Sequence, residues 1–176
     1  MEAYIVGAFR ARFQAQKGMT EKAAGQLPEE LLHVALDENT NSVAAIMKHM
    51  AGNLKSRFTD FLASDGEKPD RDRDAEFVDD LKDRAALMAL WEDGWGCLLR
   101  TLDALSDADL LRTVTIRGQP HSVADALVRA LDHQGYHTGQ AVQLSRHLAK
   151  GEWKTLTIAR GQSKQFNEAM RQKFGK

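Results

Sequence analysis

Two histidines spaced four residues apart, His133 and His137, are the residues whose type and spacing most directly suggest chemistry. They lie within a helical pattern that runs from about Ser122 to Lys150, and helical side chains at positions i and i+4 point the same way. Two imidazole nitrogens placed in this way can bind one metal ion. The alternative is that both are core histidines whose ring nitrogens bond to other protein groups.

The apolar pattern of the same helix predicts that both histidines face other helices. Apolar positions recur at the spacings of three and four that are typical of a buried stripe. The stripe comprises Val123, Leu127, Ala130, His137, Ala141, Leu144 and Leu148, with His133 just beside it. A zinc-like ion needs three or four ligands, so a third must come from another part of the chain.

Length, charge and cysteine content exclude several classes of protein. The 176 residues fit one domain, and we predict a single domain over residues 1–176. Lys and Arg (24) nearly balance Asp and Glu (25), so neither nucleic acid nor a membrane is an expected partner. Cys97 is the only cysteine and is expected to be a small core residue. With no secretory signal pattern and no long apolar run, we expect a cytoplasmic protein.

Four long helical patterns predict an all-α fold, specifically an antiparallel four-helix bundle with short connecting segments and a short C-terminal helix. They cover about residues 4–17 (ending at Gly18), 42–63, 77–105 and 122–150. Residues 27–32 are predicted to form a short helical turn, and residues 111–120 and 153–158 extended segments. The segment 64–74, rich in Asp and Arg, is predicted to be a solvated polar loop.

The bundle directs the search for a third ligand to the other histidines, which are His33, His49, His121 and His147. His147 lies ten residues past His137, about 15 Å along the helix axis, and is too far away. His121 precedes the helix. His33 belongs to a single Glu-x-x-His copy, whereas di-iron bundles need two copies and two more glutamates. His49 remains, but its periodicity places it on the flank of an apolar stripe and does not force it inward.

Two segments carry a resemblance to a known superfamily. They are the run from Asn41 to Asn53, which contains His49, and the run His133-Gln134-Gly135-Tyr136-His137-Thr138-Gly139-Gln140. Both resemble the DinB/YfiT-like superfamily of metalloenzymes, and the ending from Trp153 to Asn167 resembles a branch of unknown function. The resemblance covers almost the whole chain. It implies a four-helix bundle that commonly forms a homodimer and binds a divalent metal, usually zinc or nickel, through His49, His133 and His137.

Three neutral imidazoles would leave the ion an open position, which is the arrangement of catalytic zinc. Relatives in the superfamily include transferases and isomerases that use low-molecular-weight thiols. The resemblance therefore implies a metal-dependent thiol (S-)transferase acting on a small-molecule substrate, with a thiol as co-substrate. The alternatives are a metal-dependent hydrolase and a non-catalytic metal-binding or stress-response bundle. A zinc protease fits worse, because its motif reads His-Glu-x-x-His and the glutamate that acts as general base is Gln134 here.

No catalytic residue beyond the ligands is assigned from the sequence. Tyr136 is expected to point away from the buried stripe. Asn53, one turn after His49, could support that ligand, but we expect a solvated polar side chain. Trp91 and Trp95 could wall a pocket, although their spacing is more typical of plain core, and Ser163 is expected to cap the final helix.

Overall fold

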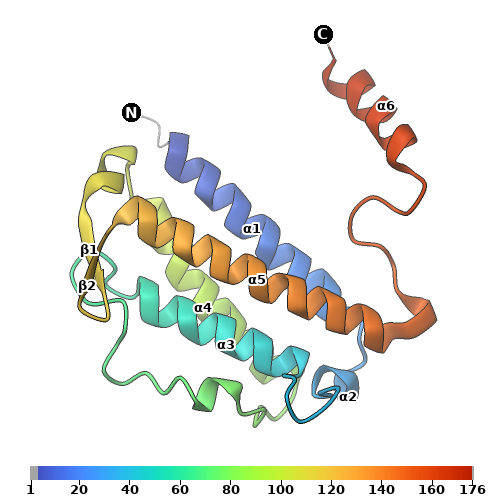
Figure 1. Ribbon diagram of the computed structural model, residues 1–176, viewed down its shortest axis with the longest axis horizontal. Coiled ribbons are helices and arrows are strands. Elements are labelled where there is room, and N and C mark those ends of the chain that lie inside the picture. The colour runs from blue at the N-terminus through green and yellow to red at the C-terminus, as the bar shows by residue number, and fades with distance from the viewer. Residues whose placement is uncertain (1–3, 176) are drawn as a thin grey trace.

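The computed structural model describes residues 4–175, which are mostly helical, so the all-α class is confirmed (Figure 1). The α-helices are α1 (Tyr4–Ala24), α2 (Glu29–Leu32), α3 (Val43–Phe58), α4 (Arg84–Ala104), α5 (Val123–Ala149) and α6 (Ser163–Phe174). The 3-10 helices are η1 (Ala75–Phe77), η2 (Asp107–Leu111) and η3 (Lys150–Glu152). One antiparallel hairpin is formed by β1 (Thr113–Ile116) and β2 (Gln119–Ser122).

The four long helices lie alongside one another and enclose the core (Figure 1). Helix α3 packs against both α4 and α5, and α1 packs against α5 and α4. Phe13, Trp91 and Trp95 are fully buried among them, and the ring of Phe13 meets Trp95 edge-on. The prediction that both tryptophans are core residues is therefore confirmed. No helix in the described range has the length and apolar character needed to cross a membrane.

Helices α3 and α5 begin where their capping residues predict. The hydroxyl of Ser42 accepts a hydrogen bond from the Ala45 amide, and that of Ser122 accepts one from Asp125. Helix α3 nevertheless ends at Phe58, five residues earlier than predicted, and Asp60 takes a left-handed backbone conformation with φ of 48°. That conformation cannot continue a right-handed helix.

The bounds of α1, α4 and α6 correct three expectations. Helix α1 runs through Gly18 to Ala24, because residues beyond the glycine, including Thr20 and Ala23, are buried against the rest of the fold. Helix α4 starts only at Arg84, where the side chain of Asp83 caps it. Ser163 is the first residue of α6 and does not cap it.

The predicted extended segment 111–120 becomes the β1–β2 hairpin. Its turn residues, Arg117 and Gly118, both have positive φ (56° and 73°), which suits a tight two-residue turn. Asp65 holds this turn, since its carboxylate oxygens accept hydrogen bonds from the amides of Arg117 (2.8 Å) and Gly118 (2.7 Å). The other predicted extended segment, 153–158, forms no strand in this structure.

Helix α6 stands apart from the other helices at the end of a long connection (Figure 1). All of its residues are exposed, including Phe166, Met170 and Phe174. These three side chains are spaced four residues apart and therefore share one face of the helix.

Candidate metal centre

The structure brings together the three histidines that the family resemblance implied. One ring nitrogen from each of His49, His133 and His137 lies within 4.8 Å of the others. His49 comes from α3, and the other two lie one turn apart on the same face of α5. His49 and His137 are buried and His133 is half-buried, so the predicted inward direction of the pair is confirmed. This group could hold a metal ion.

The other histidines lie outside the cluster. The Nδ1 atom of His33 contacts Asp79 at 2.7 Å, and His121 contacts Asp125 across the start of α5. His147 is exposed near the end of α5. Within residues 4–175, no other histidine therefore joins His49, His133 and His137 in the cluster.

The side of α3 that carries His49 is covered by the segment before α4. The ring of Phe77 in η1 stacks on the ring of His49, with a centroid separation of 4.2 Å and an interplanar angle of 22°. The Nδ1 atom of His49 lies 2.8 Å from Oε2 of Glu76. His49 is thus buried between α5 and this connecting segment, and the part played by the segment explains why helical periodicity left its direction open.

Glu76 remains ionised although it is buried. Burial raises the pKa of its carboxyl group, but hydrogen bonds from Arg71 and His49 outweigh that effect and bring the pKa below its usual value. Arg71 makes two parallel hydrogen bonds of 2.8 Å to this carboxylate. A carboxylate only accepts, so Nδ1 of His49 carries a proton, and in the neutral ring Nε2 presents its lone pair.

Gly52, one turn after His49 on α3, makes room for this carboxylate. A Cβ atom at position 52 would lie 2.6 Å from Oε1 of Glu76. That distance is shorter than any relaxed contact, so a larger residue would displace the glutamate. The glycine is therefore part of the arrangement that orients His49.

The electrostatics of the two α5 histidines keep both rings neutral. Burial, followed by the neighbouring His137 and His49, lowers the pKa of His133 to about 3. Burial and the nearby His49 also lower the pKa of His137. Neutral imidazole is the form that binds metal.

Hydrogen bonds also orient the α5 rings. Nδ1 of His137 lies 2.8 Å from Oε1 of Gln140, so it donates its proton there and leaves Nε2 free. Nε2 of His133 lies 3.2 Å from Nε2 of His49. Because the proton of His49 is on Nδ1, His133 is the donor of this contact in the metal-free chain.

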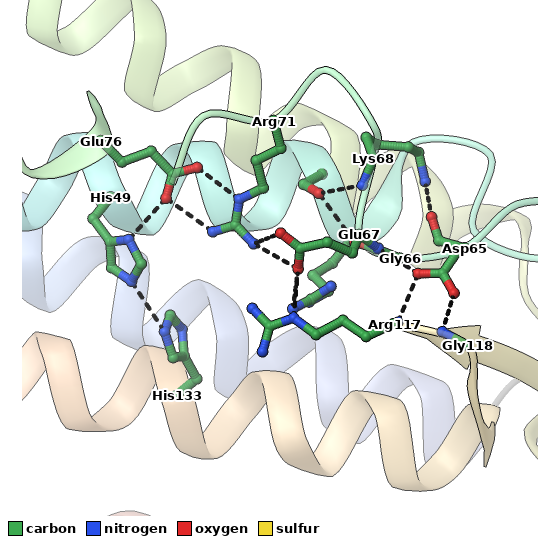
Figure 2. Close-up of polar contacts among 12 residues, drawn as sticks. His49, Asp65, Gly66, Glu67, Lys68, Arg71, Glu76, Arg117, Gly118 and His133 are labelled. Carbon is green, nitrogen blue, oxygen red and sulfur yellow. Dashed lines mark hydrogen bonds and ion pairs between the residues drawn. The ribbon is translucent and has the colours of Figure 1, made fainter. Parts of the chain in front are cut away.

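A row of charged groups continues away from the histidines (Figure 2). The contacts run in order through His133, His49, Glu76, Arg71, Glu67 and Arg117. The side chain of Arg71 is only 4% exposed, so the prediction that the segment 64–74 is simply solvated was wrong. A buried ion pair uses the same residue types as a solvated loop, and no periodic spacing marks Arg71 or Glu76 in the sequence.

A cavity of about 120 Å³ lies beside His49 and His133. Asn53 also lines it and is buried, so the expectation of a solvated side chain at this position was wrong. Tyr136 is 64% exposed, and its predicted direction away from the buried stripe is confirmed. Cys97 lies on α4, half-buried, and does not line this cavity.

The fold and this cluster define a helical protein with a three-histidine group that could hold a metal ion. The chain belongs to the family described as "Protein of unknown function (DUF1572)", whose match covers residues 2–162. The match includes the three histidines, Glu76 and Arg71, and it ends one residue before α6. A comparison with curated proteins finds no match to this chain.

Proposed function

We propose that this protein is a DinB/YfiT-like four-helix-bundle metalloprotein that binds a divalent ion through His49, His133 and His137 and transfers a low-molecular-weight thiol to a small-molecule substrate. The observation that carries the proposal is the approach of one ring nitrogen from each histidine to within 4.8 Å of the others. The packing of α1, α3, α4 and α5 supports the bundle assignment. In such bundles, ligands come from facing helices, as α3 and α5 do here.

The residues around the histidines suit a bound cation. Glu76 and Gln140 each accept the Nδ1 proton of a histidine, which turns the Nε2 lone pair of His49 and of His137 toward the cluster. Such supporting contacts orient the rings and raise their basicity. Arg71 keeps the glutamate ionised, and Phe77 covers one face of His49. Imidazole ligands suit zinc and nickel, the two ions that the superfamily resemblance implies.

The lining of the cavity favours thiol chemistry over hydrolysis. A bound divalent ion would take a thiol as its thiolate and so make it nucleophilic at neutral pH. The described residues that line the cavity include no Asp, Glu or Tyr that would act as a general base for water. Cys97 lies elsewhere on α4, so the nucleophile would be an external thiol. A cytoplasmic location fits this reading, since thiols stay reduced there.

We also propose that the chain forms a homodimer. A twelve-residue helix is marginally stable in water on its own. Helix α6 nevertheless exposes Phe166, Met170 and Phe174 on one face. A second copy of the chain would cover these side chains in a symmetric contact.

The test begins with the metal content of protein purified without a histidine tag, measured by mass spectrometry of the elements. We expect about one divalent ion per chain, and its loss in the His49→Ala, His133→Ala and His137→Ala variants. The exposed His147→Ala is the matched control and should retain the ion. Unchanged metal content in the first three variants would place the site elsewhere.

The catalytic part is tested by conjugation assays with bacillithiol, mycothiol or glutathione and a generic electrophile. Metal-loaded protein, apoprotein and His137→Ala are compared. We expect turnover only for the metal-loaded protein. Equal rates in all three would favour the non-catalytic metal-binding alternative, and hydrolysis of an ester without any thiol would favour the hydrolase.

A further inference from the structure

The cavity beside the histidines has an unusual concentration of positive charge. Five arginines line it, and the described lining contains no Asp or Glu. They are Arg57, Arg71, Arg73, Arg117 and Arg129. Among residues 4–175, the only carboxylates that lie within 4.0 Å of these guanidinium groups are those of Glu67 and Glu76. Five positive charges therefore face two negative ones.

A structural role accounts for part of this cluster. Glu67 forms ion pairs with Arg57, Arg71 and Arg117. The pair with Arg117 connects the loop before η1 to the β1–β2 hairpin (Figure 2). Arg71 also keeps Glu76 in place. Arg73 and Arg129 lie outside this role: both are exposed, and neither has a carboxylate within 4.0 Å among the described residues.

Arg57 supplies an independent sign of a missing acceptor. Its side chain is 11% exposed, and its Nη2 lies 2.9 Å from Oε2 of Glu67. Its Nη1 is buried and has no hydrogen-bond partner within the described chain. Burial, together with the repulsion of Arg71 and Arg117, lowers the pKa of this guanidinium group. A buried donor without an acceptor is costly. Arg57 lines the cavity, so an anion bound there would lie beside this guanidinium group.

The size and the apolar wall of the cavity limit which molecules can carry the bound anionic group. The cavity measures about 120 Å³. An apolar protein cavity of about 150 Å³ can hold one benzene molecule, so this one is somewhat smaller than that. The enclosed part of the ligand is therefore only a few heavy atoms in size. Apolar side chains complete the wall, and they are Phe58, Phe61, Ile116, Ala126 and Ala130. An oxyanion on a short apolar stem matches this lining.

We propose that this arginine-lined cavity binds the oxyanion group of a small organic substrate, a carboxylate or a phosphate, and holds the substrate beside His49 and His133. Arginine suits both groups, because its planar fork donates two parallel hydrogen bonds to either. The proposal rests on the proposed function for the fate of the anion, since the same cavity touches two of the three histidines. The binding step itself needs only the arginines.

The test is calorimetric titration of the metal-free full chain with inorganic phosphate and, separately, with propionate, against sodium chloride at equal ionic strength. We expect saturable binding of at least one of the two oxyanions and none of chloride. Preference for phosphate would indicate phosphorylated substrates, and preference for propionate would indicate carboxylic acids. Absence of binding by both probes would overturn the inference.

Variants connect the binding to the cavity. Arg117→Gln and Arg129→Gln change exposed side chains and should each weaken binding about tenfold, the effect of losing one charge-assisted hydrogen bond. Arg112→Gln is the matched control, because its side chain is 53% exposed, close to the 50% of Arg117, and lies outside the lining. Equal losses in all three variants would show a general charge effect and overturn the assignment.

Metal content measured on the same samples separates this inference from the proposed function. Anion binding by a protein that takes up no metal would reject the metalloprotein and retain the oxyanion site. Metal uptake without anion binding would reject the oxyanion site alone.

Discussion

The Nδ1 atom of His49 lies 2.8 Å from Oε2 of Glu76, a carboxylate that comes from 27 residues later in the chain. The contact fixes the ring proton on Nδ1 and leaves Nε2 facing His133. The orientation of His49 therefore depends on the segment before α4 as well as on α3.

Glu76→Gln should weaken metal binding without unfolding the chain. Glutamine keeps the size of the side chain but removes the negative charge that holds the proton on His49. Loss of such a supporting group typically costs about 10–100-fold in metal affinity. Competition with a chromophoric chelator measures the change. Glu92→Gln is the control, because Glu92 also forms an ion pair, with Lys17, and lies on the exposed side of α4 away from the histidines. Equal affinities for wild type and Glu76→Gln would show that the contact does not support a ligand.

Gly52→Ala should destabilise the chain, although alanine normally favours a helix. The new Cβ atom would lie 2.6 Å from Oε1 of Glu76 and would push the carboxylate away from His49. Such overpacking costs about 1–3 kcal/mol of unfolding free energy. Metal affinity should fall as well.

Gly139→Ala on α5 is the matched control for this glycine. A Cβ at position 139 meets no atom within 4 Å, so this variant should gain up to about 1 kcal/mol from helix propensity. Urea unfolding measures both variants. A stabilised Gly52→Ala with unchanged metal affinity would contradict the role given to Glu76.

The sequence predicted the regular parts of this fold because they follow from local rules. Ser42 and Ser122 cap α3 and α5, and the stripe on α5 turned His137 inward as expected. The β-branched run after Leu111 became a hairpin strand. Each of these features depends on residues within a few positions of one another.

The missed features depend on contacts between distant segments. Helix α1 continues through Gly18 because tertiary packing outweighs the weak helix propensity of glycine. Arg71 and Glu76 form a buried pair beneath an irregular segment, and their side chains have no periodicity to show that they point inward. The position of His49 could be taken only from the family resemblance, since the segment that covers its ring lies 27 residues later in the chain and the periodicity of α3 does not report it.

Asp65→Asn should loosen the hairpin at neutral pH and should matter less in acid. Hydrogen bonds from the backbone amides of Glu67, Gly118 and Arg117 hold the pKa of the Asp65 carboxyl group well below its usual range. The unfolded chain therefore takes up the proton first as pH falls. The contribution of Asp65 to stability is present above about pH 3.9, the unfolded pKa of aspartate, and is lost below it.

Urea unfolding at neutral and acid pH measures this dependence. The difference between wild type and Asp65→Asn should shrink steadily below about pH 3.9. Asp70→Asn is the control, because Asp70 lies in the same loop, is exposed and makes no hydrogen bond in the described range. A difference that stays constant with pH would mean that the ionised carboxylate does not anchor the turn.

Replacing Phe166 and Met170 with serine should convert the proposed homodimer to a monomer. Both side chains lie on the exposed apolar face of α6, and burying them between two chains is worth about 1.5–3 kcal/mol for each fully covered residue. Light scattering should give about twice the 19.6 kDa of one chain for wild type and the single mass for the variant. The matched control replaces Lys164 and Glu168, which lie on the opposite face of α6, and should remain dimeric. A monomeric wild type at micromolar concentration would reject the dimer, and a dimer that survives the Phe166 and Met170 changes would place the contact away from α6.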